Sequence, residues 1–207
     1  MKNDYALEQD PSQPAEIDWN ARFSATQRTY VYRVLCYPEH HDEDEECKDH
    51  GIPFEWDRSW RIRGSSGNVG LDIDAMQEAA THMEGTQDFS TFRGARCQRQ
   101  SPIVTMKSIR IHSVLPFGVD GNETKTQNHA NNPSCGPQLV TLSIVGNSFL
   151  YRQVRNMVGC LVDVGKGKLS AQEVPSLIGA KQRSKAPSMA PAHGLFLTDV
   201  QHGDFYV

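Results

Sequence analysis

The order of strand-like and helix-like segments constrains the fold of this 207-residue chain more than any other feature. Apolar residues with a two-residue period, enriched in aromatic and β-branched side chains, are typical of strands. In RTYVYRVLCY, for example, Tyr30, Tyr32 and Val34 would share one face of a strand. The sequence predicts strands at residues 28–37, 103–111, 139–145 and 194–201.

Two other segments have apolar residues every three or four positions, which is typical of amphipathic helices, and a third helix is predicted from the residues at its start. Asp72 suits the N-cap of the first helix, and Asn147 or Ser148 suits that of the second. Ser170 and Glu173 form a capping-box pattern at the start of the third. The predicted helices cover residues 72–84, 147–164 and 170–181. This mixed order predicts an α+β fold, a mostly antiparallel sheet flanked by helices.

The remaining long stretches lack a clear period. Residues 1–20 are polar and contain proline, and we expect an extended lead-in to a single domain at residues 21–207. Residues 39–60 and 115–138 are acidic or rich in Gly, Asn and Pro, which predicts two loop insertions within that domain.

Charge is divided unevenly along the chain, although the net charge is only −4. Residues 1–92 hold 8 Lys and Arg against 19 Asp and Glu, whereas residues 93–207 hold 13 against 6. A basic half indicates a polyanion partner, since Lys and Arg release counterions from phosphates. The alternative is an ordinary solvated surface.

Composition argues against several classes of protein. No run approaches the ~18 apolar residues that a membrane helix requires. The five cysteines are odd in number and form no CxxC pair, which fits a reducing compartment better than a disulfide framework. The polar, acidic start MKNDYALEQDPSQPAE matches neither a secretory signal nor a transit peptide. We expect a soluble intracellular protein with no membrane partner, its compartment unassigned.

One acidic loop contains residue types that bind metals, namely His40, His41, Cys47 and His50. Their spacing matches no standard zinc site. We therefore predict no metal site.

Two segments place arginine beside residues that could contact RNA. In RTYVYRV, Tyr30 would stack on a base while Arg28 and Arg33 hold phosphates, or the segment is an ordinary core strand. In GTQDFSTFRGARCQRQSP, arginine forks would bind phosphates, or the loop is merely solvated and Asp88 caps a turn. The arginines of this loop are Arg93, Arg96 and Arg99.

A third segment, FLYRQVRNMVG, places Arg155 among apolar positions of a predicted helix. A charge there requires a partner, and a carboxylate from elsewhere would be held ionised in return. The alternative is a side chain that extends to the surface.

These segments together resemble the TruA-type tRNA pseudouridine synthases. The resemblance extends from about Asp18 to Val200, and the last two of its motifs are most similar to the animal pseudouridine synthase-like members. The motifs are FSA followed by RTYVY, DFSTFR with CQRQSP downstream, FLYRQVRNMVG, and APAHGLFL. The resemblance implies a pseudouridine synthase core whose N-terminal part is missing from this chain.

The resemblance also implies an enzyme that isomerises uridine in tRNA or another structured RNA, without metal or organic cofactor. An aspartate attacks the uridine after the base leaves its stack, the glycosidic bond breaks, and the base reattaches through carbon 5. Tyr30 would stack on that base and assist the final proton removal, Arg155 would pair with the nucleophile, and His193 would lie in a structural turn. Charge more than motif assigns the phosphate-facing residues: Arg28, Arg93, Arg96, Arg99, Lys166, Lys168, Lys181, Arg183 and Lys185.

The nucleophilic aspartate itself is not found in the chain. The family carries it in an Arg-x-Asp-x-Gly-Val-His segment several dozen residues before the tyrosine strand, but only 29 residues precede Tyr30 here. In the nearest match, CKDHGIP, Cys47 and Pro53 replace the Arg and His of the motif, and Asp49 follows Tyr30.

Two interpretations follow from the missing aspartate. The chain is a fragment of a complete synthase, inactive alone, or a short protein that binds RNA or a partner without catalysis. The presence of both Tyr30 and Arg155 favours the fragment, which would have open strand edges and a tendency to form a homodimer.

Overall fold

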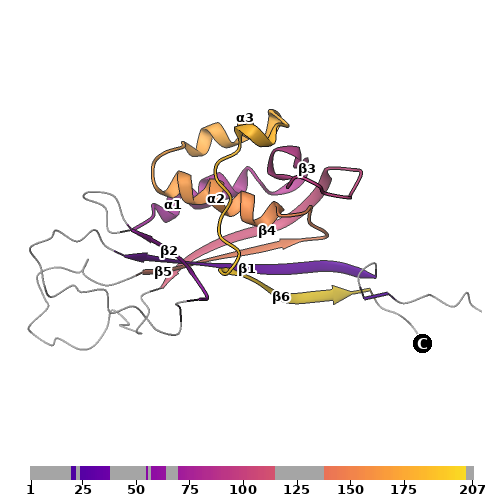
Figure 1. Ribbon diagram of the computed structural model, residues 1–207, viewed down its shortest axis with the longest axis horizontal. Coiled ribbons are helices and arrows are strands. Elements are labelled where there is room, and N and C mark those ends of the chain that lie inside the picture. The colour runs from indigo at the N-terminus through magenta and orange to yellow at the C-terminus, as the bar shows by residue number, and fades with distance from the viewer. Residues whose placement is uncertain are drawn as a thin grey trace, which may run out of the picture.

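The computed structural model describes residues 20–21, 24–37, 55, 57–63, 70–114 and 138–203. A six-stranded sheet is covered on one face by three helices, so the predicted α+β class is confirmed (Figure 1). The strands are β1 (Ala25–Tyr37), β2 (Trp60–Arg63), β3 (Gly85–Asp88), β4 (Ile103–Val114), β5 (Gln138–Gly146) and β6 (Leu195–His202). The helices are α1 (Ile73–Thr81), α2 (Gln153–Gly165) and α3 (Val174–Gly179).

The long strand β1 is paired along both of its edges, in a sheet whose order is β2-β1-β5-β4-β3. One edge of β1 pairs antiparallel with β5 from Arg28 to Cys36. The other edge is shared, because its first part pairs antiparallel with β6 and its last part pairs with β2. Only the short β1–β2 ladder is parallel among these pairings, as the predicted mostly antiparallel sheet requires.

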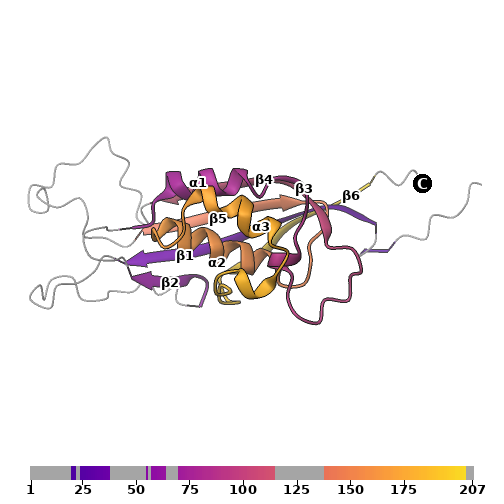
Figure 2. The ribbon, with the colours of Figure 1, turned by 90° about the horizontal axis from the view of Figure 1, so that it is seen from above.

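The core lies between the sheet and the helices. Figure 2 shows α1 and α2 running over the sheet, and the two helices contact each other. From the sheet, Tyr32, Leu142 and Ile144 are fully buried, as are Met76 of α1 and Leu161 of α2. No helix in the described ranges is long and apolar enough to span a membrane.

The predicted helix starts are right at two of three positions. The Asp72 carboxylate accepts a hydrogen bond from the N–H of Ala75 (2.9 Å) and caps α1, and Ser170 with Glu173 forms the capping box before α3. The predicted cap at Asn147 or Ser148 is wrong, because α2 begins at Gln153. The N–H of Asn147 instead donates to the carbonyl of Thr105 (3.1 Å), which continues the sheet.

Two short strands were not predicted, and both have four residues. β3 and the 3-10 turn Ser90–Phe92 lie where the sequence predicts a loop, and β2 begins where the predicted insertion at 39–60 ends. Four residues are too few to establish a two-residue period. Residues 1–19, 115–137 and the candidates in the acidic loop, including Asp49, lie outside the described residues.

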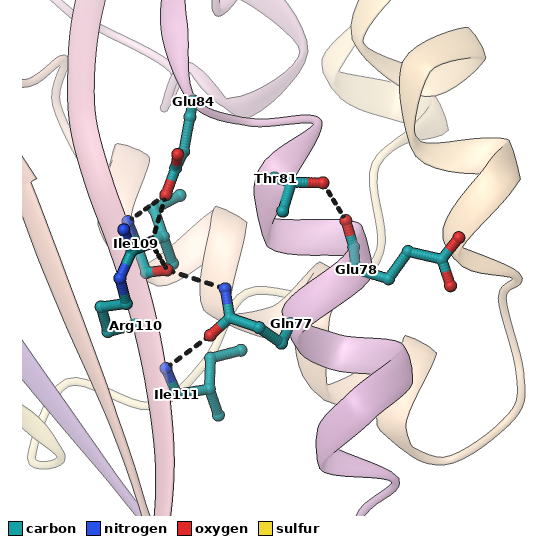
Figure 3. A network of polar contacts seen from close by, with 7 residues as sticks. All are labelled: Gln77, Glu78, Thr81, Glu84, Ile109, Arg110 and Ile111. Carbon is teal, nitrogen blue, oxygen red and sulfur yellow. Dashed lines mark hydrogen bonds and ion pairs between the residues drawn. The ribbon is translucent and has the colours of Figure 1, made fainter.

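Side chains from α1 and the turn after it cover the edge of β4 beyond its pairing with β3 (Figure 3). Gln77 donates to the carbonyl of Ile109 (3.0 Å) and accepts from the N–H of Ile111 (3.0 Å). Glu84 accepts from the N–H of Ile109 (2.8 Å) and from the guanidinium of Arg110 (2.9 Å). The N–H and carbonyl of Ile109 and the N–H of Ile111, which point away from β5, are therefore satisfied, so this stretch of the edge is not open as expected.

The opposite side of the sheet is formed by β2 and β6, which both pair with β1. In the described part of the chain, no strand pairs with the outer edge of β2 or β6. Leu197 of β6 is 53% exposed on this side.

The covered edge gives a prediction for stability. Gln77→Met keeps the side-chain length but leaves the N–H of Ile111 without its acceptor, so the free energy of unfolding should fall by about 1–3 kcal/mol. Urea denaturation followed by circular dichroism measures the loss. The matched control is Gln98→Met, because Gln98 is exposed. Equal stability of the two variants would contradict the role of Gln77.

Candidate functional site

The site begins with a close contact between α2 and the segment 188–190 that crosses it. A Cβ placed on Gly159 would lie 2.0 Å from the carbonyl oxygen of Ser188. Glycine is therefore required at this position of α2, because any side chain would push the two backbones apart.

This contact brings Ala190 beside Arg155. The N–H of Ala190 donates to the backbone carbonyl of Arg155 (3.1 Å), and Nε of Arg155 donates to the carbonyl of Ala190 (2.7 Å). The terminal nitrogens of the half-buried guanidinium have no hydrogen bond or ion pair with any described residue. The guanidinium is thus oriented by the main chain and keeps two nitrogens for a carboxylate.

Tyr32 links this arginine to β1. Its hydroxyl donates to the carbonyl of Pro191 (2.7 Å). Burial raises the pKa of Tyr32 well above its usual value, and the nearby charge of Arg155 partly opposes that effect. Tyr32 therefore stays neutral. Its hydrogen bond to Pro191 ties the segment that holds Arg155 to the sheet.

Tyr30 lies two residues before Tyr32 on the same face of β1, roughly 7 Å along the strand. Its ring meets that of Phe149 edge to face, with centroids 5.0 Å apart and planes at 87°. The ring is only partly buried. The structure thus brings the predicted Tyr30 and Arg155 to the same side of the sheet, next to α2.

The segment 93–100, here called the arginine loop, packs against residues 147–152, here called the connector. The N–H of Gly94 donates to the carbonyl of Tyr151 (2.8 Å), and the N–H of Tyr151 donates to Sγ of Cys97 (3.4 Å). Arg99 donates to the hydroxyl of Ser148 (2.6 Å). These bonds fix the loop beside Phe149 and hence beside Tyr30.

The predicted arginines differ in whether their side chains are bonded to the protein itself. Arg93 braces the loop from inside, by donating to the carbonyls of Cys97 (3.0 Å) and Arg99, and Arg28 donates to the carbonyl of Asn147 (2.9 Å). Arg96 is exposed, and its side chain makes no hydrogen bond or ion pair within the described ranges. One end of the sheet therefore holds all four of these arginines: Arg28, Arg93, Arg96 and Arg99.

The groups around the thiol of Cys97 change its pKa. Burial by itself would raise its pKa, but backbone N–H groups of Tyr151 and Arg99 and the side chain of Arg93 lower it below its usual value. Stabilisation of a thiolate indicates that the arginine loop favours negative charge.

Two of the predicted lysines, Lys166 and Lys168, do not join this cluster. Lys166 follows the far end of α2, about 20 Å from its start by helix geometry. Its ammonium lies 5.8 Å from the ring centroid of Trp60, and Lys168 lies 4.0 Å from Asp163. Their predicted role in RNA binding would require a second contact area.

Two of the last three basic residues, Lys181 and Arg183, have structural partners. Lys181 lies 3.3 Å from Asp88, whose pKa is lowered mainly by its hydrogen bond with Ser90. Asp88 accepts from the N–H of Ser90 (2.9 Å) and so caps a turn, as one interpretation predicted. Arg183 donates to the carbonyl of Ala186 (3.1 Å), and Lys185 is exposed.

Asn156 was not singled out from the sequence. It is buried in α2, donates to the carbonyl of Phe92 (2.7 Å) and accepts from Arg183 (3.0 Å), so it ties the start of the arginine loop to the helix. The sequence signal for Asn156 is an amide side chain within the apolar stripe of a helix, because a buried amide needs hydrogen-bond partners. His193 is exposed in a turn closed by the N–H of Leu195 and the carbonyl of Ala192 (3.1 Å).

Among the residues with described positions, no group of three or more His, Cys, Asp or Glu could hold a metal ion.

Comparison with known proteins places this geometry in context. Residues 79–202 match a family model described as tRNA pseudouridine synthase. Proteins called tRNA pseudouridine synthase A are similar: that of Maricaulis maris is 36% identical over 205 residues, and that of Caulobacter vibrioides 35% over 190. These alignments cover 96% and 92% of this chain but only 66% and 62% of the relatives.

The contact at Gly159 gives a prediction for stability. Gly159→Ala should lower the free energy of unfolding by about 1–3 kcal/mol, because its methyl group would overlap the carbonyl of Ser188. Chemical denaturation measures the change. Gly179→Ala is the matched control, since nothing lies within 4 Å of a methyl group there, and it should leave stability unchanged within ~1 kcal/mol. Similar losses in both variants would contradict the close contact.

Proposed function

The chain belongs to the tRNA pseudouridine synthase family, and on this premise we propose that it supplies the base-stacking tyrosine, the carboxylate-binding arginine and the RNA-facing surface for the isomerisation of uridine to pseudouridine in tRNA. The nucleophilic aspartate comes from a segment outside these 207 residues. The chain by itself is therefore inactive.

The observation that carries the proposal is the state of Arg155. Its Nε is bound to the carbonyl of Ala190 (2.7 Å), while its terminal nitrogens have no partner within the described part of the chain. A half-buried guanidinium of this kind favours an incoming carboxylate and keeps it ionised. An ionised aspartate is the form that attacks as a nucleophile.

Tyr30 and the arginine loop supply the other two functions. Tyr30 has an aromatic partner on one side, Phe149, and is partly exposed, which suits stacking on an unpaired base. The arginine loop lies against the same connector that contains Phe149 and would hold the RNA phosphates. RNA would thus approach the sheet from the end where β1 begins.

The second candidate function is RNA binding without catalysis. The observation that favours it is the sequence CKDHGIP, in which Asp49 lacks the Arg and His neighbours of the family motif and follows Tyr30. The first interpretation needs a carboxylate from another segment, and the second needs none.

Tritium release from tRNA containing 5-tritiated uridine separates the two. The 207-residue chain should release no tritium above a protein-free control, because it has no nucleophile. An extended chain that carries a family segment with the Arg-x-Asp-x-Gly-Val-His motif should release tritium, and Arg155→Ala should abolish that release. Activity of the 207-residue chain would contradict an external nucleophile, and inactivity of the extended chain would favour RNA binding alone.

Binding to tRNA should be weak and strongly salt-dependent. Arg96→Gln should weaken it and reduce the slope of log affinity against log salt by about 1, because one phosphate contact is lost. Arg58→Gln is the matched control, since Arg58 is exposed and is not among the residues assigned to the RNA, and it should change neither quantity. Fluorescence anisotropy between about 50 and about 200 mM salt measures both. An equal effect of the two changes would contradict binding at the arginine loop.

A further inference from the structure

Tyr151 is the exposed aromatic residue of the connector. It is 49% exposed, although its neighbour Leu150 is 3% exposed and belongs to the core. The guanidinium carbon of Arg152 lies 4.9 Å from the centroid of the Tyr151 ring. An aromatic ring with a guanidinium over it is a surface on which nucleic-acid bases stack.

The ring is held in place by the arginine loop. Both backbone groups of Tyr151 are bonded to that loop, its carbonyl by Gly94 (2.8 Å) and its N–H by Cys97 (3.4 Å). Gly94 allows this approach, because a Cβ there would lie 2.7 Å from the carbonyl oxygen of Tyr151 and 3.1 Å from its Cδ1. An immobilised ring loses little freedom when it binds.

The backbone around the ring is also unusual. Arg152, the N-cap of α2, has a φ of 61°, and Arg96 in the facing loop has a φ of 64°. Residues other than glycine seldom adopt this left-handed conformation, and it concentrates at binding sites. Here it occurs in both of the segments that meet at Tyr151, the connector and the arginine loop.

The positive charge around Tyr151 indicates the chemistry of the ligand that would bind there. Arg93, Arg96, Arg99 and Arg152 form no ion pair with a carboxylate in the described part of the chain. An exposed ring within such a cluster suits a ligand that has both phosphates and flat bases. Unpaired RNA has both.

We propose that Tyr151 and Arg152 form a stacking platform for one unpaired base of the RNA, separate from the base received by Tyr30. This inference rests on the proposed function, because it assumes that RNA lies on the arginine loop. It adds a second base contact, two residues along the connector from Phe149.

The test compares the unchanged chain with Tyr151→Ala, Tyr151→Leu and Tyr151→Phe. Affinity for a fluorescent tRNA transcript should fall roughly 5- to 150-fold in the Ala and Leu variants and stay within about twofold in the Phe variant. The salt slope should not change in any of them, because no phosphate contact is lost. Heparin, which has sulfates but no bases, should bind all four proteins equally.

Three results would overturn the inference. Affinity for tRNA could be unchanged in Tyr151→Leu, or the Leu and Phe variants could lose equally, or heparin binding could fall together with tRNA binding. Each would show that the ring supports the loop or contributes nothing. If the unchanged chain does not bind tRNA at all, the proposed RNA-binding function fails as well, so the two failures are distinguishable.

Discussion

The candidate site depends on one contact between main chains, at the point where α2 passes the segment containing Ala190. Gly159 has no side chain, so the two backbones approach closely enough for Ala190 and Arg155 to exchange two hydrogen bonds. The next residue, Pro191, accepts the hydroxyl of Tyr32 and ties the same segment to β1. A charged side chain is thereby oriented by backbone groups, which need no counter-ion to hold their positions.

The fold divides basic residues of the second half of the sequence between the two ends of α2. Four arginines gather where the connector meets the arginine loop, whereas Lys166 and Lys168 follow the last turn of the helix. The helix between them is almost fully buried, so it separates the two groups of charges with an apolar barrier. Only one group lies beside Tyr30. These two groups of basic residues therefore form separate surfaces.

Periodicity predicted the fold class, the four longer strands and two helix starts, because these depend on neighbours in the sequence. It failed for α2, where Asn147 and Ser148 are good capping residues but the chain first completes a bond to β4. Motif resemblance indicated Tyr30 and Arg155, and the structure brings them to one side of the sheet. It could not indicate the role of Gly159, since the atom that glycine accommodates lies 29 residues away.

Gln77 and Glu84 have a further consequence for assembly of the sheet. Their side chains offer the edge of β4 a donor and acceptors in the places where a neighbouring peptide chain would offer them, so α1 and the turn after it take the place of a strand. No additional strand can add there without displacing them. In the described part of the chain, the outer edges of β2, β3 and β6 pair with no further strand, so this stretch of β4 is closed to a growing sheet while both ends of the sheet are not.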